Sequence, residues 1–197
     1  MLSELIDFVT ELFPSINPYT KDKVKSAIRQ FEISSGGKTP SRNIDYLTNQ
    51  PFDYLTQGDI ISNLPFVRYN SKTGVRGLLV TEGILLSNTC DAVRDPALVF
   101  APLIELSNFT NEQQEQIKKN EIYRLLYLPD GKISNKVIDF SMVNSLPRVM
   151  IVEGLKKAYM TKNSSLNRYG YYLFLVKLTV HFMRPEDAEA QISRGIV

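Results

Sequence analysis

The chain has few of the residues on which disulfide scaffolds and small metal sites depend. Its 197 residues include one cysteine, Cys90, and one histidine, His181. A single cysteine excludes an intramolecular disulfide, and one Cys with one His cannot complete a structural zinc site made only of nitrogen and sulfur ligands. No phosphate-binding glycine loop, dinucleotide fingerprint or nucleophile-elbow motif occurs. We therefore expect no metal and no cofactor, and neither an ATPase, a Rossmann dehydrogenase nor an α/β-hydrolase.

The sequence also lacks a long apolar run and a basic, apolar leader. Residues 1–13 carry Glu4, Asp7 and Glu11, which a secretory signal would not. The most apolar run, residues 169–183, contains Lys177 and His181 and is shorter than the ~20 residues that span a bilayer. We expect no membrane contact and, with a lone thiol, a cytoplasmic protein.

What is present is enough for a folded core. Hydrophobic residues make up 43% of the chain, charged residues make up 22%, and the net charge is +2. This balance is typical of a globular protein and unlike a disordered one. The length is sufficient for one main domain with additions.

The order of patterns predicts four segments. Apolar spacing of three and four indicates a helical segment over residues 1–33, and a Ser/Gly/Pro-rich stretch indicates a linker over 34–50. Short apolar runs separated by turn signals, at 58–61, 77–87, 97–104, 122–128, 137–140 and 149–152, predict strands within residues 51–152. Residues 70–74 are a turn, and Thr110 with Gln113 predicts a capped helix ending near Asn120. Residues 153–197 are expected to be helical, with Asn163 or Ser164 capping a helix that runs to about Arg184.

Four short motifs then suggest a family. They are Gly58-Asp59-Ile60, the strand 84–87, the segment 99–103 and the segment 137–148. Their order resembles the MazF/PemK-like toxin superfamily over residues 57–148. The resemblance implies an α+β protein built on a small SH3-like β-barrel, here with helical extensions at both ends. It also implies a bacterial toxin–antitoxin or phage-defence setting.

The sequence departs from that family at the positions that carry its ribonuclease activity. The family's Arg-Pro pair is replaced by Glu82-Gly83, and Leu103 stands where the family has Thr or Ser. Cleavage through the 2′-hydroxyl needs a base and a group that stabilises the charge on phosphorus, and Gly and Leu supply neither. We expect the fold without the activity, and Arg76 is a weak candidate to replace the missing Arg.

A polar cluster follows the strand 84–87. Asn88, Cys90, Asp91 and Arg94 fit either a ligand-binding loop, with Cys90 and Asp91 as weak catalytic candidates, or a turn whose side chains bond local backbone groups. A thiol nucleophile usually needs a basic partner, and the one His lies far away in the sequence.

Basic residues gather in one part of the chain. Residues 141–184 carry seven basic side chains and one acidic side chain, a net charge of +6, whereas the flanking parts carry −2 each. Interleaved tyrosines make this segment suitable for RNA or single-stranded DNA, and the alternative is a solvated surface. The candidate nucleic-acid or partner-binding residues are Arg148, Lys156, Lys157, Arg168, Lys177, His181 and Arg184, of which the last three share one helix face.

The sequence thus predicts a barrel protein that binds nucleic acid or a protein partner and lacks the family's ribonuclease site. If the partner is a protein, it could be a second copy of the chain, bound through the C-terminal helix. The alternatives are an active, metal-independent endoribonuclease with a rearranged site, and a non-catalytic subunit of a larger assembly.

Overall fold

The computed structural model describes residues 45–48, 51–183 and 192–193, and these form a mixed α+β fold. The predicted N-terminal helical segment, most of the predicted linker and the end of the C-terminal region, including Arg184, lie outside the described residues. The described helices and strands, in chain order, are β1 (Asp59–Tyr69), β2 (Arg76–Leu85), α3 (Thr89–Arg94), β3 (Ala97–Glu105), α4 (Asn111–Lys118), β4 (Leu125–Leu126), β5 (Lys136–Asp139), β6 (Asn144–Pro147), α5 (Arg148–Lys156), β7 (Lys162–Ser165) and α6 (Arg168–Met183). Two short 3₁₀ turns, Leu106–Asn108 and Phe140–Met142, complete the set.

The strands form one antiparallel sheet of seven strands. Its order is β4-β5-β3-β2-β1-β7, and β6 pairs with β3 beside this path. The sheet is not closed by backbone pairing, so the expected small barrel is not confirmed. The side chain of Asn144, in β6, nevertheless spans to β1: its Oδ1 accepts from the Val67 amide at 2.8 Å, and its Nδ2 donates to the Val67 carbonyl at 3.4 Å.

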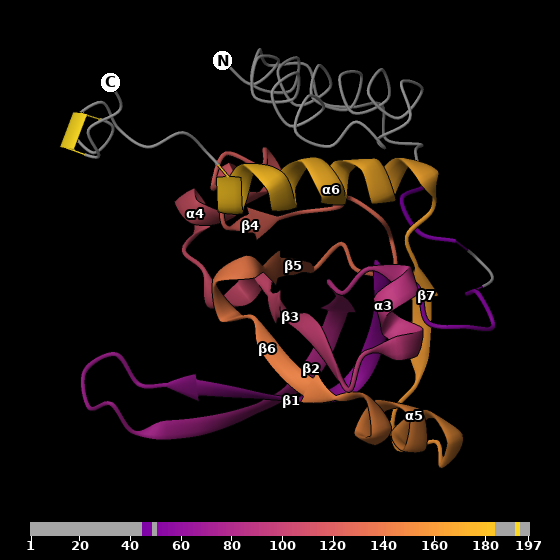
Figure 1. Cartoon of the computed structure of the whole chain (residues 1–197). Helices are drawn as coiled ribbons and strands as arrows, with labels where there is room; N and C mark the ends of the chain where they lie inside the picture. Colours follow the sequence, from indigo (N-terminus) through magenta and orange to yellow (C-terminus); the bar gives the residue numbers. More distant parts are fainter. Residues whose placement is uncertain (1–44, 49–50, 184–191, 194–197) are drawn as a thin grey trace.

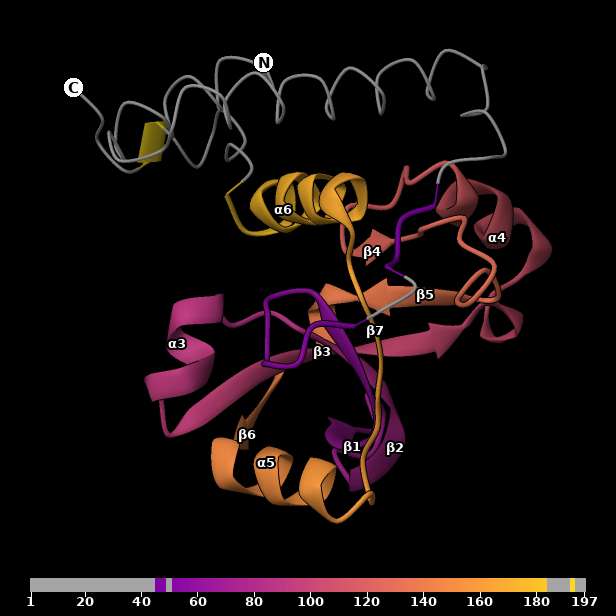
Figure 2. The same cartoon turned by 90° about the vertical axis from the view of Figure 1, so that its right-hand side faces the viewer.

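The sheet separates the two larger apolar cores, and α6 lies on one side of it with α5 at the opposite end of the molecule (Figures 1 and 2). On the first side, Leu173 and Phe174 of α6 pack with Ile60, Ile84 and Ile138 of the sheet. On the second side, Ile151 of α5 joins a cluster that includes Ile61, Leu64, Phe66, Leu98 and Phe100. The C-terminal segment from residue 153 therefore shares its cores with the sheet, and β7 is one of the sheet's strands.

Two predicted features match the structure closely. Thr110 caps α4 with the reciprocal bonds of a capping box, and the chain turns at 70–75 between β1 and β2. Gly83 is buried where β1 and β2 cross the core. A Cβ there would lie 2.6 Å from the Phe66 ring, so only glycine fits without a shift.

Several predicted elements differ. Residues 149–152 belong to helix α5 instead of a strand, because Ile151 and Gly154 are buried on a helical spacing against the second core. The predicted strand 122–128 is reduced to Leu125–Leu126. Asn163 and Ser164 lie in β7, and Asn167 is the residue whose side chain accepts from the Gly170 amide at the start of α6.

The stretch predicted to be a linker is partly in the core. Tyr46 and Leu47 are buried, and Leu47 forms a β-bridge with Leu166. The buried Asp130 holds this segment, because its Oδ2 accepts from the amides of Tyr46 and Leu47 at 3.1 Å each.

Among the described residues, no helix is long and apolar enough to cross a bilayer.

Candidate nucleic-acid interface

The outer halves of β1 and β2 form a hairpin that projects from the sheet (Figure 1). We call residues 64–81 the arm. Its strands pair only with each other from Leu64–Thr81 to Tyr69–Arg76, whereas the inner ends of β1 and β2 pair with β7 and β3. Phe66 fixes the base of the arm because its side chain is fully buried in the second core.

The tip of the arm is held by its own polar groups. The Asn70 amide donates to the Val75 carbonyl, and the Asn70 side-chain oxygen accepts from the amides of Lys72 and Thr73. Gly74 takes a positive φ of 67°, which closes the turn at no steric cost. The sequence Asn-Ser-Lys-Thr-Gly therefore presents Lys72 on a well-defined turn.

The arm carries positive charge only. Residues 60–81 contain Arg68, Lys72 and Arg76 and no acidic residue, and all three side chains are exposed. Among the described residues none of the three forms an ion pair. Many cations elsewhere have carboxylate partners, including Lys156 and Lys157 with Glu153, Arg94 with Asp91, and Lys162 with Asp59.

The three cations point in different directions. Directly opposed residues of an antiparallel pair share a face, and successive residues alternate. Arg68 lies across Gly77, with its Cγ 3.7 Å from the position of a Cβ there. Arg76 is paired with Tyr69 on the opposite face, and Lys72 lies at the tip. The face of Arg76 continues toward the sheet with Leu78 and Val80, which are 63% and 57% exposed.

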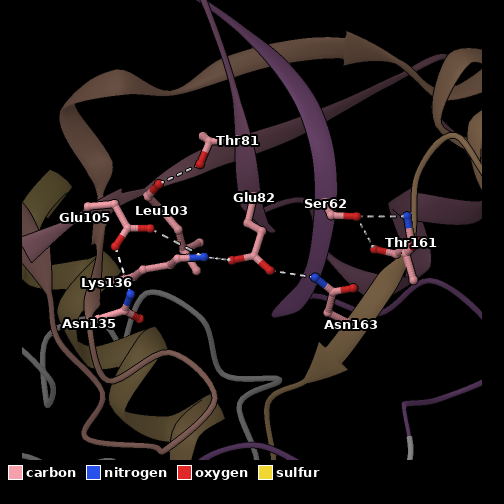
Figure 3. Close-up of polar contacts among 9 residues, drawn as sticks. All are labelled: Ser62, Thr81, Glu82, Leu103, Glu105, Asn135, Lys136, Thr161 and Asn163. Atoms are coloured by element: carbon pink, nitrogen blue, oxygen red, sulfur yellow. Dashed lines mark hydrogen bonds and ion pairs between the residues drawn. The ribbon is translucent and has the colours of Figure 1, made fainter.

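A second polar cluster lies where the arm joins the sheet (Figure 3). Lys136 Nζ lies 2.6 Å from Glu82 Oε2 and 3.6 Å from Glu105 Oε1. The other Glu82 oxygen accepts from Asn163 Nδ2 at 2.6 Å, and Asn135 Nδ2 donates to Glu105 at 2.9 Å. The bond to Glu82 raises the pKa of Lys136 above its usual value, so the ammonium stays charged at neutral pH.

The predicted loop cluster at 88–94 forms the short helix α3. Asn88 is its N-cap and accepts from the Cys90 amide, while Arg94 donates to Asp91 at 3.2 Å. These are local contacts, as the turn interpretation expects. Cys90 is exposed, and among the described residues its thiol has no cationic partner.

The basic C-terminal residues do not form one surface. Lys156 and Lys157 are exposed near the end of α5, on the opposite side of the sheet from α6 (Figure 1), and Arg148 begins α5. Arg168 begins α6, but its side chain lies outside the described part. The His181 ring lies tilted against that of Phe140, with ring centroids 5.9 Å apart.

Lys177 differs most from the sequence prediction, because both the binding interpretation and the solvated-surface alternative expect an exposed side chain. It is 5% exposed, and its Nζ donates to the Asn120 carbonyl at 2.7 Å, beyond the end of α4. Burial lowers the pKa of this amine to about 8. The side chain is therefore an internal contact between α6 and the α4 region.

Arg76 lies in the arm and not beside the positions that are catalytic in the family. Glu82 lies six positions further along β2, a distance of about 20 Å on an extended strand. Leu103 is 2% exposed, and Gly83 is buried. Within the described residues, no three Asp, Glu, His or Cys side chains are arranged to hold a metal ion.

Sequence reasoning missed most of the arm. Its exposed surface includes Arg68, Tyr69 and Lys72, which the sequence patterns do not single out, and Arg76, which they predict only as a catalytic candidate. The available signal was the run of 22 residues, 60–81, with three cations and no acid. The contacts of Glu82 with Lys136 and Asn163 left no such signal, because 54 and 81 residues separate the partners.

No protein-family model matches the chain, and no curated protein matches its sequence.

Proposed function

We propose that this protein binds nucleic acid through the β1–β2 arm, with Arg68, Lys72 and Arg76 contacting phosphates. The observation that carries the proposal is the projection of three exposed cations without carboxylate partners on an arm free of acidic residues. A cation already paired within the protein must give up that partner to bind phosphate, whereas these three need only release water.

The proposed binding surface is the arm and not the C-terminal segment that the sequence predicts. Lys177 is internal, and Lys156 and Lys157 share Glu153. Tyr69 adds one exposed ring beside Arg76, a side chain on which a base can stack.

The test is the salt dependence of binding. Fluorescence anisotropy would follow the whole protein with labelled RNA, single-stranded DNA and duplex DNA between about 50 and 200 mM salt. Replacing the three cations together (R68Q, K72Q and R76Q) should weaken binding and reduce the slope of log K against log salt by about two to three.

The matched control is K156Q with K157Q, which removes two exposed charges from α5. It should leave the slope unchanged. If this control loses binding while the arm variant keeps it, the interface is α5. If no nucleic acid binds at about 50 mM salt, the proposal is wrong.

We further propose that the chain is a divergent MazF/PemK-like barrel protein of a bacterial toxin–antitoxin or phage-defence system. The motif order supports this, as does the antiparallel arrangement of β1, β2, β3 and β6, in which Asn144 spans the gap to β1. The neighbouring gene is the simplest check, since a toxin of this kind travels with an antitoxin. An unrelated neighbourhood in every genome that carries the gene would count against the assignment.

A ribonuclease with a rearranged site is the second candidate, and the Glu82–Lys136 pair favours it. Glu82 occupies the position of the family's Arg, and Lys136 brings a charged ammonium within 2.6 Å of it. A carboxylate that accepts the 2′-hydroxyl proton and an ammonium beside the phosphorus are the two groups that metal-independent cleavage needs.

The test is cleavage of a mixed RNA pool in the presence of a metal chelator. E82Q and K136M should each abolish cleavage. E105Q, which alters the other carboxylate near the same lysine, should retain most of it. Equal cleavage by wild type and E82Q, or none by the wild type, would remove this candidate.

A further inference from the structure

The directions of the arm's cations bear on which nucleic acid it fits. Arg68 lies on one face of the ribbon, Arg76 on the other, and Lys72 at the tip. From this geometry we propose that the free end of the arm enters the major groove of duplex DNA. The inference rests on the proposed function and names its substrate class.

The dimensions support this. Paired strands lie about 4.8 Å apart, so a two-stranded ribbon is roughly 10 Å wide with its backbone edges. The major groove of B-DNA is about 12 Å wide and admits such a ribbon. The free end begins at about Arg68 and Gly77, because Val67 is still held by Asn144 and Phe66 is buried.

The charge pattern fits a groove better than a single strand. A groove has a phosphate backbone along each wall, so a ribbon inside it gains from cations on both faces. A protein that binds a single strand usually places cations and several aromatic rings on one surface. Tyr69 is the one aromatic residue exposed on the arm, and it shares a face with Arg76 and not with Arg68.

Duplex RNA fits less well than duplex DNA. The major groove of an A-form helix is deep and narrow, and side chains do not reach its floor. A ribbon roughly 10 Å wide would be excluded from it. The arm should therefore prefer a DNA duplex to an RNA duplex of the same sequence.

The experiment compares four probes of the same sequence and of about 20 base pairs or nucleotides, which is two helical turns. Duplex DNA, duplex RNA, single-stranded DNA and single-stranded RNA are titrated with the whole protein by fluorescence anisotropy. We expect the tightest binding to duplex DNA. If three phosphates are contacted, a fourfold rise in salt should weaken this binding by roughly 40-fold.

Single substitutions then test the two faces separately. R68Q and R76Q should each lower the slope of log K against log salt for duplex DNA by about one. R94Q is the matched control, because Arg94 is exposed but paired with Asp91 outside the arm, and it should leave the slope unchanged. If only one of R68Q and R76Q lowered the slope, a single face of the arm would bind DNA, and the groove inference would be wrong.

The outcomes separate the inference from the proposed function. Equal or tighter binding to either single strand or to duplex RNA, still dependent on the arm, would overturn the groove and leave nucleic-acid binding standing. No binding to any probe would overturn both.

The exposed Leu78 and Val80 offer a competing use of the arm, as a contact between two copies of the chain. Sizing of the free protein and of L78S tests it. A monomer in both cases leaves the Arg76 face free for DNA. A dimer that L78S dissociates would cover that face and overturn the groove inference.

Discussion

Asp59 is a fully buried carboxylate whose recorded partners all donate to it. Its two oxygens accept from the Thr56 amide at 2.7 Å, the Thr56 hydroxyl at 2.7 Å, the Ser165 hydroxyl at 2.6 Å and Lys162 Nζ at 3.1 Å. These contacts join the start of β1 to β7, more than 100 residues later in the chain. Asp59 therefore has a structural role, because it ties the start of β1 to β7.

Asp59→Asn should therefore destabilise the fold strongly. The introduced amide would place its NH₂ group against groups that are themselves donors, and the Lys162 ammonium would lose its carboxylate partner. Together these changes should lower the free energy of unfolding by about 3–5 kcal/mol. The measurement is urea unfolding against Asp91→Asn, an exposed ion-pair variant that should change stability by less than about 1 kcal/mol. Similar losses in the two variants would contradict this role of Asp59.

Lys177 makes stability depend on pH. Its folded-state pKa of about 8 lies below the ordinary value of 10.5, so between these pH values the unfolded chain holds more protons than the folded one. The contribution of Lys177 to the free energy of unfolding should therefore be lowest below pH 8 and rise as the pH increases from about 8 to 10.5.

Lys177→Met removes the titrating group and tests this. The wild type should gain stability relative to the variant as pH rises from 7 to 10, by up to roughly 3 kcal/mol. Urea unfolding of both proteins at each pH is the measurement. A difference that stays constant with pH would show that the folded-state amine titrates normally.

At the scale of elements, the side chain of Asn144 links β6 to β1. One side chain satisfies both the amide and the carbonyl of Val67, where a further strand would otherwise pair. This contact also marks the point beyond which the arm is free.

Asn144→Ala should loosen the base of the arm. Losing the bond to the Val67 amide should cost about 1–2 kcal/mol, and that amide should exchange with solvent faster. Hydrogen exchange and urea unfolding measure these effects. Asn135→Ala, which removes an exposed amide bonded to Glu105, should leave Val67 exchange unchanged. Unchanged exchange in Asn144→Ala would contradict the role given to this side chain.

Local signals predicted some elements well and others poorly. Thr110 with Gln113 and the turn at Asn70 depend on contacts within five residues, so their sequence is sufficient. Residues 148–156 are rich in Val and Ile, which favour strands, but packing against the second core makes them helical. The sequence predicts a helix start at residues 163–164, but these residues form strand β7. Their strand partner, β1, lies about 100 residues earlier in the chain, so no local pattern indicates the pairing.

At the scale of the whole molecule, α6 and the sheet share one core. Phe174 is fully buried and meets Phe140 with ring centroids 6.1 Å apart. Helix and sheet should therefore unfold together, and residues 51–152 should not form a unit independent of α6.

Phe174→Ala should lower the unfolding free energy by about 3–5 kcal/mol, since it leaves a cavity between helix and sheet. Far-UV and near-UV circular dichroism should still report one coincident transition. Phe182→Ala, at a side chain that is 60% exposed, should change stability by less than about 0.5 kcal/mol. Two separate transitions would show that α6 folds apart from the sheet.

The sequence by itself determined what depends on composition and on neighbouring residues. It predicted a mixed α+β protein, the capped helix at Thr110 and the turn at 70–74. It also contains the acid-free run 60–81, which the charge count over larger segments concealed. These properties are local, because a side chain and its partner lie within a few residues.

The tertiary structure decided where charges face and which distant groups meet. It divided the +6 segment by burying Lys177, pairing Lys162 with Asp59 and placing α5 and α6 apart. It joined Glu82 to Lys136 and left the arm's cations in solvent. Neither outcome follows from spacing along the chain, because burial and long-range pairing arise only when the strands are assembled into one sheet.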